Sequence, residues 1–159
     1  MGAPYVVSSS TVVEVTPEQA FDGVLAAPLS ELFTERSGPI PPIRECRDQE
    51  GAWGEPGQTR TIVLDDGSRN LETLVAADRP GSYRYRLSDF TGAFKLLVRS
   101  VDGEFAFRPD RADRQRTRVT WTWQLHPTNP ATRLLLPLLG IFWRGYAEKM
   151  WPRFAARLA

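Results

Sequence analysis

The C-terminal part of the chain joins a strand that carries two tryptophans to a long apolar helix, and this junction restricts the possible folds. Apolar and polar residues alternate over residues 119–125, a pattern typical of a strand with one buried face. Its apolar positions are Val119, Trp121, Trp123 and Leu125. Asn129 and Pro130 form a helix start signal, and they predict a helix that runs to Leu158 with a bend at Pro137. A helix this apolar needs cover, so we expect a sheet to wrap around it.

The rest of the chain predicts the sheet itself and two short helices. Residues 5–15 have the pattern of a first strand, and start signals at Thr16 and Pro28 predict two helices after it. Residues 43–125 alternate in the manner of about six consecutive strands. We therefore expect an α+β fold in which a curved antiparallel sheet of about seven strands surrounds the long C-terminal helix.

Composition narrows the function classes. A chain of 159 residues with 42% apolar and 25% charged residues fits one globular domain over residues 1–159. The net charge of +1 provides no strong field to attract nucleic acid. Proline and glycine interrupt the longest apolar run, residues 134–143, which is too short to cross a bilayer. The N-terminus lacks a signal-peptide pattern, so we expect a cytoplasmic protein.

The chain has one histidine, one cysteine and scattered carboxylates, without the spacing of a metal site. Cys46 is the only cysteine and is expected to be a half-buried strand residue, and His126 is the only histidine, expected near a strand end on the outer face. No zinc-like spacing and no glycine-rich phosphate loop occur. The sequence therefore predicts neither a metal nor a cofactor.

A curved sheet stands off from a single helix, and the space left between them predicts an internal cavity. Residues 88–95 are expected to form its lip, opposite the proline-rich loop at residues 38–42. The residues expected to contact a ligand there are Thr61, Leu74, Tyr83, Tyr85, Leu87, Phe94, Phe105, Phe107, Trp121, Trp123, Leu139, Phe142 and Tyr146. The same aromatic set is also typical of a packed core, which is the alternative interpretation.

Several stretches resemble one known superfamily. They are residues 15–21 (VTPEQAF), 78–80 (DRP), 103–107 (GEFAF) with Pro109, 117–121 (TRVTW), Leu135 with Pro137 and Leu138, and 143–158. Together they resemble the START-like, or Bet v 1-like, superfamily, and within it the bacterial polyketide cyclase/dehydrase and lipid transport group. This resemblance extends over essentially the whole chain.

The resemblance implies a helix-grip fold with a hydrophobic internal pocket. Members of the superfamily bind lipids, polyketides, hormones or other apolar molecules. Some members are cyclases or dehydratases, and others perform no chemistry. The resemblance assigns no catalytic residue, because catalytic members use different pocket residues.

Turn geometry predicts one pair of carboxyl groups inside the cavity. A type II turn at residues 79–82 would place Glu72 opposite Asp89 on the inner side of the sheet, and the hairpin at Asp66 and Gly67 would place Thr61 opposite Glu72. Two facing carboxyl groups would raise the pKa of one of them and make it a candidate general acid or base. A slip of one residue would instead turn Glu72 toward water.

Three functions remain compatible with the sequence. The first is binding or carriage of a hydrophobic small molecule, lipid or polyketide-like, in the internal cavity of a monomer or weak homodimer, without turnover. The second is a cyclase or dehydratase that uses acid/base residues in the pocket. The third is a protein-interaction module without a ligand.

Overall fold

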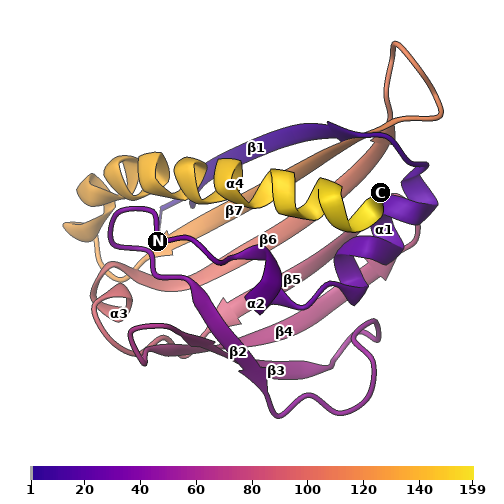
Figure 1. The fold of residues 1–159 in the computed structure, drawn as a ribbon. Coiled ribbons are helices and arrows are strands. Elements are labelled where there is room, and N and C mark those ends of the chain that lie inside the picture. Colours follow the sequence, from indigo (N-terminus) through magenta and orange to yellow (C-terminus); the bar gives the residue numbers. More distant parts are fainter. Residues whose placement is uncertain (1) are drawn as a thin grey trace.

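The computed structural model describes residues 2–159 and has a curved sheet of seven antiparallel strands that holds one long helix (Figure 1). The strands are β1 (Tyr5–Val13), β2 (Ile43–Arg47), β3 (Thr59–Leu64), β4 (Arg69–Asp78), β5 (Ser82–Ser88), β6 (Val98–Pro109) and β7 (Thr117–Pro127). The helices are α1 (Pro17–Ala26), α2 (Leu29–Leu32), α3 (Phe94–Leu97), the 3-10 helix η1 (Thr132–Leu135) and α4 (Leu136–Leu158). The order across the sheet is β1-β7-β6-β5-β4-β3-β2. This architecture confirms the α+β helix-grip fold.

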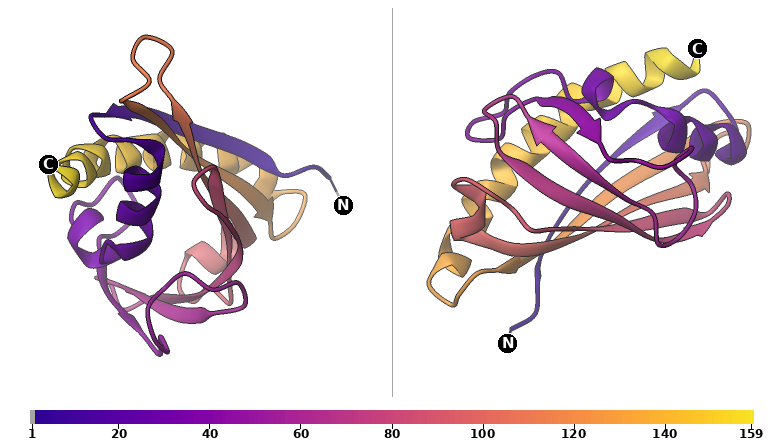
Figure 2. Two further views of the ribbon diagram at one scale, coloured as in Figure 1. Left: turned by 90° about the vertical axis from the view of Figure 1, so that its right-hand side faces the viewer. Right: turned by 90° about the horizontal axis from the view of Figure 1, so that it is seen from below.

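Helix α4 supplies the second wall of the core. The sheet curves around the interior, and α1, α2 and α4 lie along its open side (Figure 2). The buried positions of α4 follow the helical spacing of three and four residues. They are Leu136, Leu139, Gly140, Trp143, Tyr146, Ala147, Met150, Trp151 and Phe154. The expected alternation on β7 is confirmed as well, since Val119, Trp121 and Leu125 are buried in the same core.

The C-terminal helix begins later than the sequence predicts. Asn129 accepts a hydrogen bond from the backbone N–H of Thr132 at 3.0 Å, so it caps the short turn that leads into η1. Helix α4 then starts at Leu136. Pro137 lies in its first turn, where a missing N–H leaves no hydrogen bond unmade. The expected bend at Pro137 is therefore wrong, and the proline inside the helix is Pro152.

Helix α1 closes one end of the curved sheet. Thr16 caps its N-terminus, as the sequence predicts. The cap is a capping box, in which the Thr16 hydroxyl accepts from the N–H of Gln19 and the Gln19 side chain accepts from the N–H of Thr16. The Phe21 ring packs against Tyr83 of β5 and Phe107 of β6, with centroid distances of 6.3 Å and 5.5 Å. The interior is therefore closed by aromatic rings at this end.

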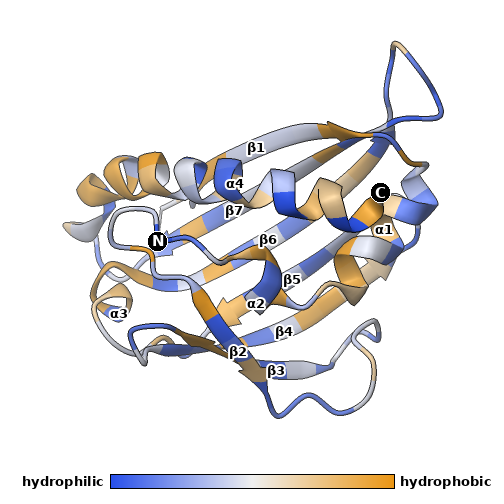
Figure 3. Ribbon diagram, viewed as in Figure 1, coloured by the Kyte–Doolittle hydropathy of each residue, from blue (hydrophilic) through white to orange (hydrophobic). Residues whose placement is uncertain are grey.

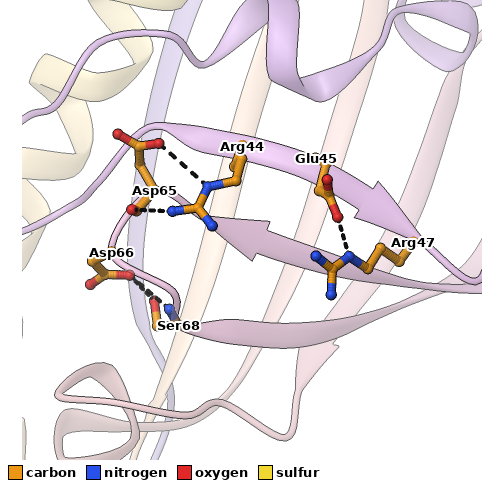
Figure 4. Close-up of polar contacts among 6 residues, drawn as sticks. All are labelled: Arg44, Glu45, Arg47, Asp65, Asp66 and Ser68. Carbon is orange, nitrogen blue, oxygen red and sulfur yellow. Dashed lines mark hydrogen bonds and ion pairs between the residues drawn. The ribbon is translucent and has the colours of Figure 1, made fainter.

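The hairpin between β3 and β4 has three loop residues where the sequence predicts two. The N–H of Leu64 bonds to the carbonyl of Ser68 at 2.9 Å, and Gly67 has a φ of 86°, which suits glycine. The Asp66 carboxylate accepts from Ser68 Oγ at 2.6 Å and from the Ser68 N–H at 2.9 Å (Figure 4). These bonds lower the pKa of Asp66. Arg44 of β2 donates to the carbonyl of Asp65 at 2.7 Å and joins the neighbouring strand to the loop.

His126 lies one residue before the end of β7, near a strand end as the sequence predicts. His126 Nε2 lies 2.8 Å from Asp102 Oδ2, and Asp102 also accepts from Arg86 Nε at 2.9 Å. Burial tends to raise the pKa of Asp102, but the bonds from Arg86 and His126 outweigh it and the pKa is lowered.

Cys46 is a half-buried residue of β2, as expected. Within residues 2–159, no helix combines the length and the apolar character needed to span a membrane.

Candidate ligand-binding cavity

The inner faces of β4 and β5 carry the central residues of the candidate site. Burial alternates along both strands, so that Asn70, Glu72 and Leu74 on β4 share the inner side with Tyr83 and Tyr85 on β5. The alternation of polar and apolar segments is visible along these strands in Figure 3. Glu72 therefore faces the interior, which was one of the two orientations that the sequence left open.

The predicted register between β4 and β5 is wrong, and so is the pair of facing carboxyl groups. The chain turns over residues 78–81, so Asp78 pairs with Ser82. A bulge between Leu74 and Ala76 shifts the register again, and Glu72 lies opposite Leu87. Asp89 lies beyond the end of β5, where it is exposed.

The predicted pairing of Thr61 with Glu72 is also wrong, because the β3–β4 hairpin loop has three residues. This loop places Arg60, and not Thr61, opposite Glu72. Thr61 lies on the other face of β3, where its hydroxyl contacts Asp48 at 3.5 Å. Glu72 therefore has a basic neighbour inside the protein in place of the expected hydroxyl and carboxyl groups.

Arg60 and Glu72 form a buried ion pair. Arg60 Nε lies 2.6 Å from Glu72 Oε1, and the two side chains are 7% and 3% exposed. The guanidinium also stacks 4.0 Å from the ring centroid of Trp53 and donates from Nη1 to Gln49 at 3.3 Å. Burial raises the pKa of the Glu72 carboxyl, and the positive charge of Arg60 opposes that shift. Arg60 therefore supplies the positive charge that compensates the buried Glu72 carboxylate.

A cavity of about 160 Å³ lies between the inner face of the sheet, α4 and the loops near α2 and α3. Its lining includes Pro39, Ile40 and Pro41 from the proline-rich loop and Phe90 and Phe94 from the expected lip. The rings of Phe90 and Phe94 are 4.8 Å apart. Tyr146 of α4 donates its hydroxyl hydrogen to the carbonyl of Pro41 at 3.0 Å and ties the helix to the proline-rich loop.

Nine residues expected to contact a ligand border this cavity. They are Tyr83, Tyr85, Leu87, Phe94, Phe105, Trp121, Trp123, Leu139 and Tyr146. Glu72 borders it too. Four expected residues do not: Thr61 points outward, Leu74 is fully buried in the core, Phe107 packs on Phe21, and Phe142 packs over Gly38.

The sequence interpretation missed several cavity residues. Among them are Phe33, Ile62 and Asn70. Asn70 was detectable in principle, because it stands two residues before Glu72 and therefore on the same face of β4. Phe33 follows a short helix, and no local pattern indicates that its side chain reaches the sheet.

The phenol of Tyr85 connects the aromatic wall. Its oxygen accepts hydrogen bonds from Trp121 Nε1 at 2.7 Å and from Trp123 Nε1 at 2.8 Å. The ring reaches these residues by passing over Gly103 of β6, where a Cβ atom would lie 2.1 Å from Tyr85 Cζ. Phe105 and Trp121 stack beside it at a centroid distance of 5.4 Å and an interplanar angle of 8°. The wall is thus closely packed and aromatic, and its two indole N–H groups have a common hydrogen-bond acceptor.

Known structures share this fold. Norcoclaurine synthase from Thalictrum flavum has a TM-score of 0.69 and 13% sequence identity, with 96% of this chain and 84% of the synthase covered. A START superfamily protein from Mycobacterium smegmatis has a TM-score of 0.66 and 11% identity, with 96% of each chain covered. Ara h 8.0201 has a TM-score of 0.57 and 16% identity, with 91% of this chain and 97% of its own covered. At such identities the likeness concerns the fold.

Sequence comparison identifies the family. None of the curated proteins compared with the chain matches it. Residues 5–159, which include every strand and helix of the fold, match the family described as polyketide cyclase / dehydrase and lipid transport. The chain therefore belongs to the polyketide cyclase/dehydrase and lipid transport family.

Proposed function

We propose that the protein binds a compact, mainly apolar small molecule in the cavity between the sheet and α4, and holds it without chemical change. The observation that carries this proposal is a partly open cavity whose wall consists of aromatic and aliphatic side chains with a few buried polar groups. Concave apolar sites of this kind are the usual places where proteins bind small molecules. Membership of the family supports binding of a hydrophobic molecule in general.

The size of the cavity limits the ligand. Its volume of about 160 Å³ is below the roughly 300–1,000 Å³ of sites for drug-sized molecules. A dry cavity of roughly 150 Å³ in another protein accepts benzene. We therefore favour a ligand with one ring, or an aliphatic molecule of similar size, over a lipid with a full-length acyl chain.

Acid/base catalysis is the second candidate function. Glu72 borders the cavity, and burial raises its pKa, as a general acid or base requires. The ion pair with Arg60 argues for a structural role instead, since it occupies one carboxylate oxygen. Mass spectrometry of a ligand recovered from protein purified from its own host separates the two functions. An unchanged ligand supports binding alone, whereas a substrate that becomes a cyclised or dehydrated product supports the enzyme.

Filling the cavity is expected to abolish binding. Leu139 borders the cavity and is 4% exposed, whereas Leu138, its neighbour on α4, is 53% exposed and lies outside it. Leu139→Trp places an indole where the ligand would lie, so the affinity for ethylbenzene is expected to fall at least about tenfold, or roughly 1.4 kcal/mol. Leu138→Trp is the matched control and is expected to bind as the wild type does.

Isothermal titration calorimetry with ethylbenzene measures both variants, and far-UV circular dichroism checks that each is folded. Equal binding by the wild type and a folded Leu139→Trp variant would contradict the proposed location of the site. Absence of ethylbenzene binding to the wild type, together with no copurifying small molecule, would contradict the proposed function.

A further inference from the structure

Among the residues of the described chain that border the cavity, Asn70 alone has a fully buried side-chain atom without a hydrogen-bond partner. Asn70 borders the cavity and is 7% exposed, and its Oδ1 atom is buried without a hydrogen bond. Asparagine is uncommon in strands, and a buried amide without partners is unfavourable. Neither packing nor a protein hydrogen bond accounts for an asparagine at this inner position of β4.

Most other polar groups on the wall already have partners. The indole N–H groups of Trp121 and Trp123 both bond to Tyr85, and the Tyr146 hydroxyl bonds to Pro41. The Tyr83 hydroxyl makes no hydrogen bond within residues 2–159, but its ring lies toward the end of the sheet closed by Phe21. Asn70 lies instead beside the expected lip of the cavity at residues 88–95, because the backbone of its neighbour Arg69 bonds to Thr91, which also borders the cavity.

The charges beside Asn70 restrict the group that it can bind. Glu72 lies two residues away on the same face, about 7 Å along the strand, and its charge is compensated by Arg60. Arg69 and Asp66 also border the cavity, but both are exposed to solvent. A carboxylate ligand would add a second anion next to Glu72, and an ammonium ligand would add a cation near Arg60, in both cases without a buried counter-charge. A neutral group that both donates and accepts a hydrogen bond satisfies the Asn70 amide without this cost.

We infer that Asn70 anchors a hydroxyl group of the ligand at the mouth of the cavity, so that the ligand class is a compact phenol or alcohol. The hydroxyl donates to Asn70 Oδ1 and accepts from Nδ2, and the apolar part of the ligand packs against the aromatic wall. This inference rests on the proposed function, because it assigns the polar end of the ligand that the cavity is proposed to bind.

The test compares two probes that differ by the hydroxyl alone, 4-ethylphenol and ethylbenzene, on the wild type and on Asn70→Leu. Leucine keeps the approximate shape of asparagine and removes both hydrogen-bonding atoms. The affinity for 4-ethylphenol is expected to fall about fivefold or more, the size of one hydrogen bond, while the affinity for ethylbenzene stays the same or rises. Thr73→Val is the matched control on the opposite face of β4, and it is expected to change neither affinity.

The outcomes separate this inference from the proposed function. A selective loss of 4-ethylphenol binding in Asn70→Leu, with ethylbenzene binding retained, supports the inference and shows that the variant is folded. Equal changes for the two probes, or no change for either, overturn the role of Asn70 while ethylbenzene binding to the wild type leaves the cavity function standing. Failure of both probes to bind the wild type overturns both.

Discussion

Replacing Glu72 by leucine is expected to lower the free energy of unfolding by about 3–5 kcal/mol. The substitution leaves the Arg60 guanidinium charged and buried, with a 7% exposed side chain that still contacts Gln49 and the Trp53 ring but no carboxylate partner. Arginine does not lose its proton under these conditions, so the protein must hold the charge without compensation or admit water. Urea denaturation followed by circular dichroism measures the loss.

The double variant Arg60→Met/Glu72→Leu tests the physical cause. Removing both charges together and filling the space with apolar side chains is expected to restore most of the stability lost in Glu72→Leu, because desolvation of the pair offsets much of its attraction. The interaction energy from the double-mutant cycle is therefore large. Additive losses in the double variant would show that Glu72 stabilises the fold through another contact.

The exposed pair of Arg79 and Asp22 provides the control. Its geometry is better, with two contacts of 2.8 Å and 2.9 Å, but the side chains are 54% and 57% exposed. Asp22→Leu is expected to leave the denaturation midpoint nearly unchanged, because both groups are solvated with or without the contact. A similar loss at both sites would indicate that burial is not the cause.

Replacing Gly103 by alanine is expected to be the second severe change, with a loss of about 3 kcal/mol or more. The new methyl group would lie 2.1 Å from Tyr85 Cζ, and the ring is buried and held on both sides. Overpacking of this kind costs roughly 1–3 kcal/mol. Displacing the phenol also leaves the Trp121 and Trp123 N–H groups without an acceptor, at about 1 kcal/mol or more each.

The indole N–H resonances of Trp121 and Trp123 give the local readout in ¹H–¹⁵N spectra. Both are expected to shift in Gly103→Ala. Gly54→Ala is the control, because no atom lies within 4 Å of the Cβ position at Gly54. An unchanged pair of indole signals and an unchanged stability in Gly103→Ala would mean that the Tyr85 ring is not confined by its neighbours.

The fold was accessible from the sequence because the strongest patterns are long and act together. The alternation on residues 119–125 and the apolar spacing of the last helix each specify one buried face, and two such faces cover each other in few ways. The first residue of α4 could not be predicted in the same way. Asn129 caps a turn that leads into the 3-10 helix η1, and this arrangement has the same sequence signals as the start of an α-helix. Local signals mark where a helix can begin, and packing decides where it does begin.

The cavity was predicted in outline, but its central contacts were not. Two departures of one residue, the turn at residues 78–81 and the bulge at Val75, combine so that Glu72 keeps its inner face and changes its partner from Asp89 to Leu87. A third, the extra loop residue before Ser68, brings Arg60 to Glu72. Bulges and loop lengths depend on the curvature of the whole sheet, and no short window of sequence contains that information.

The pairing of β1 with β7 has a consequence for how the protein is made. Ser10 of β1 bonds to Thr120 of β7 across 110 residues of chain. During synthesis, β1 therefore emerges from the ribosome long before β7, the strand with which it pairs. Until β7 is available, the backbone N–H and C=O groups of β1 are hydrogen-bonded to water or form non-native pairs. Contacts between such distant residues slow folding, because a large loop loses its freedom before the contact forms. Early docking of the nascent N-terminal strand by a chaperone would shorten the period in which that open edge can recruit another chain.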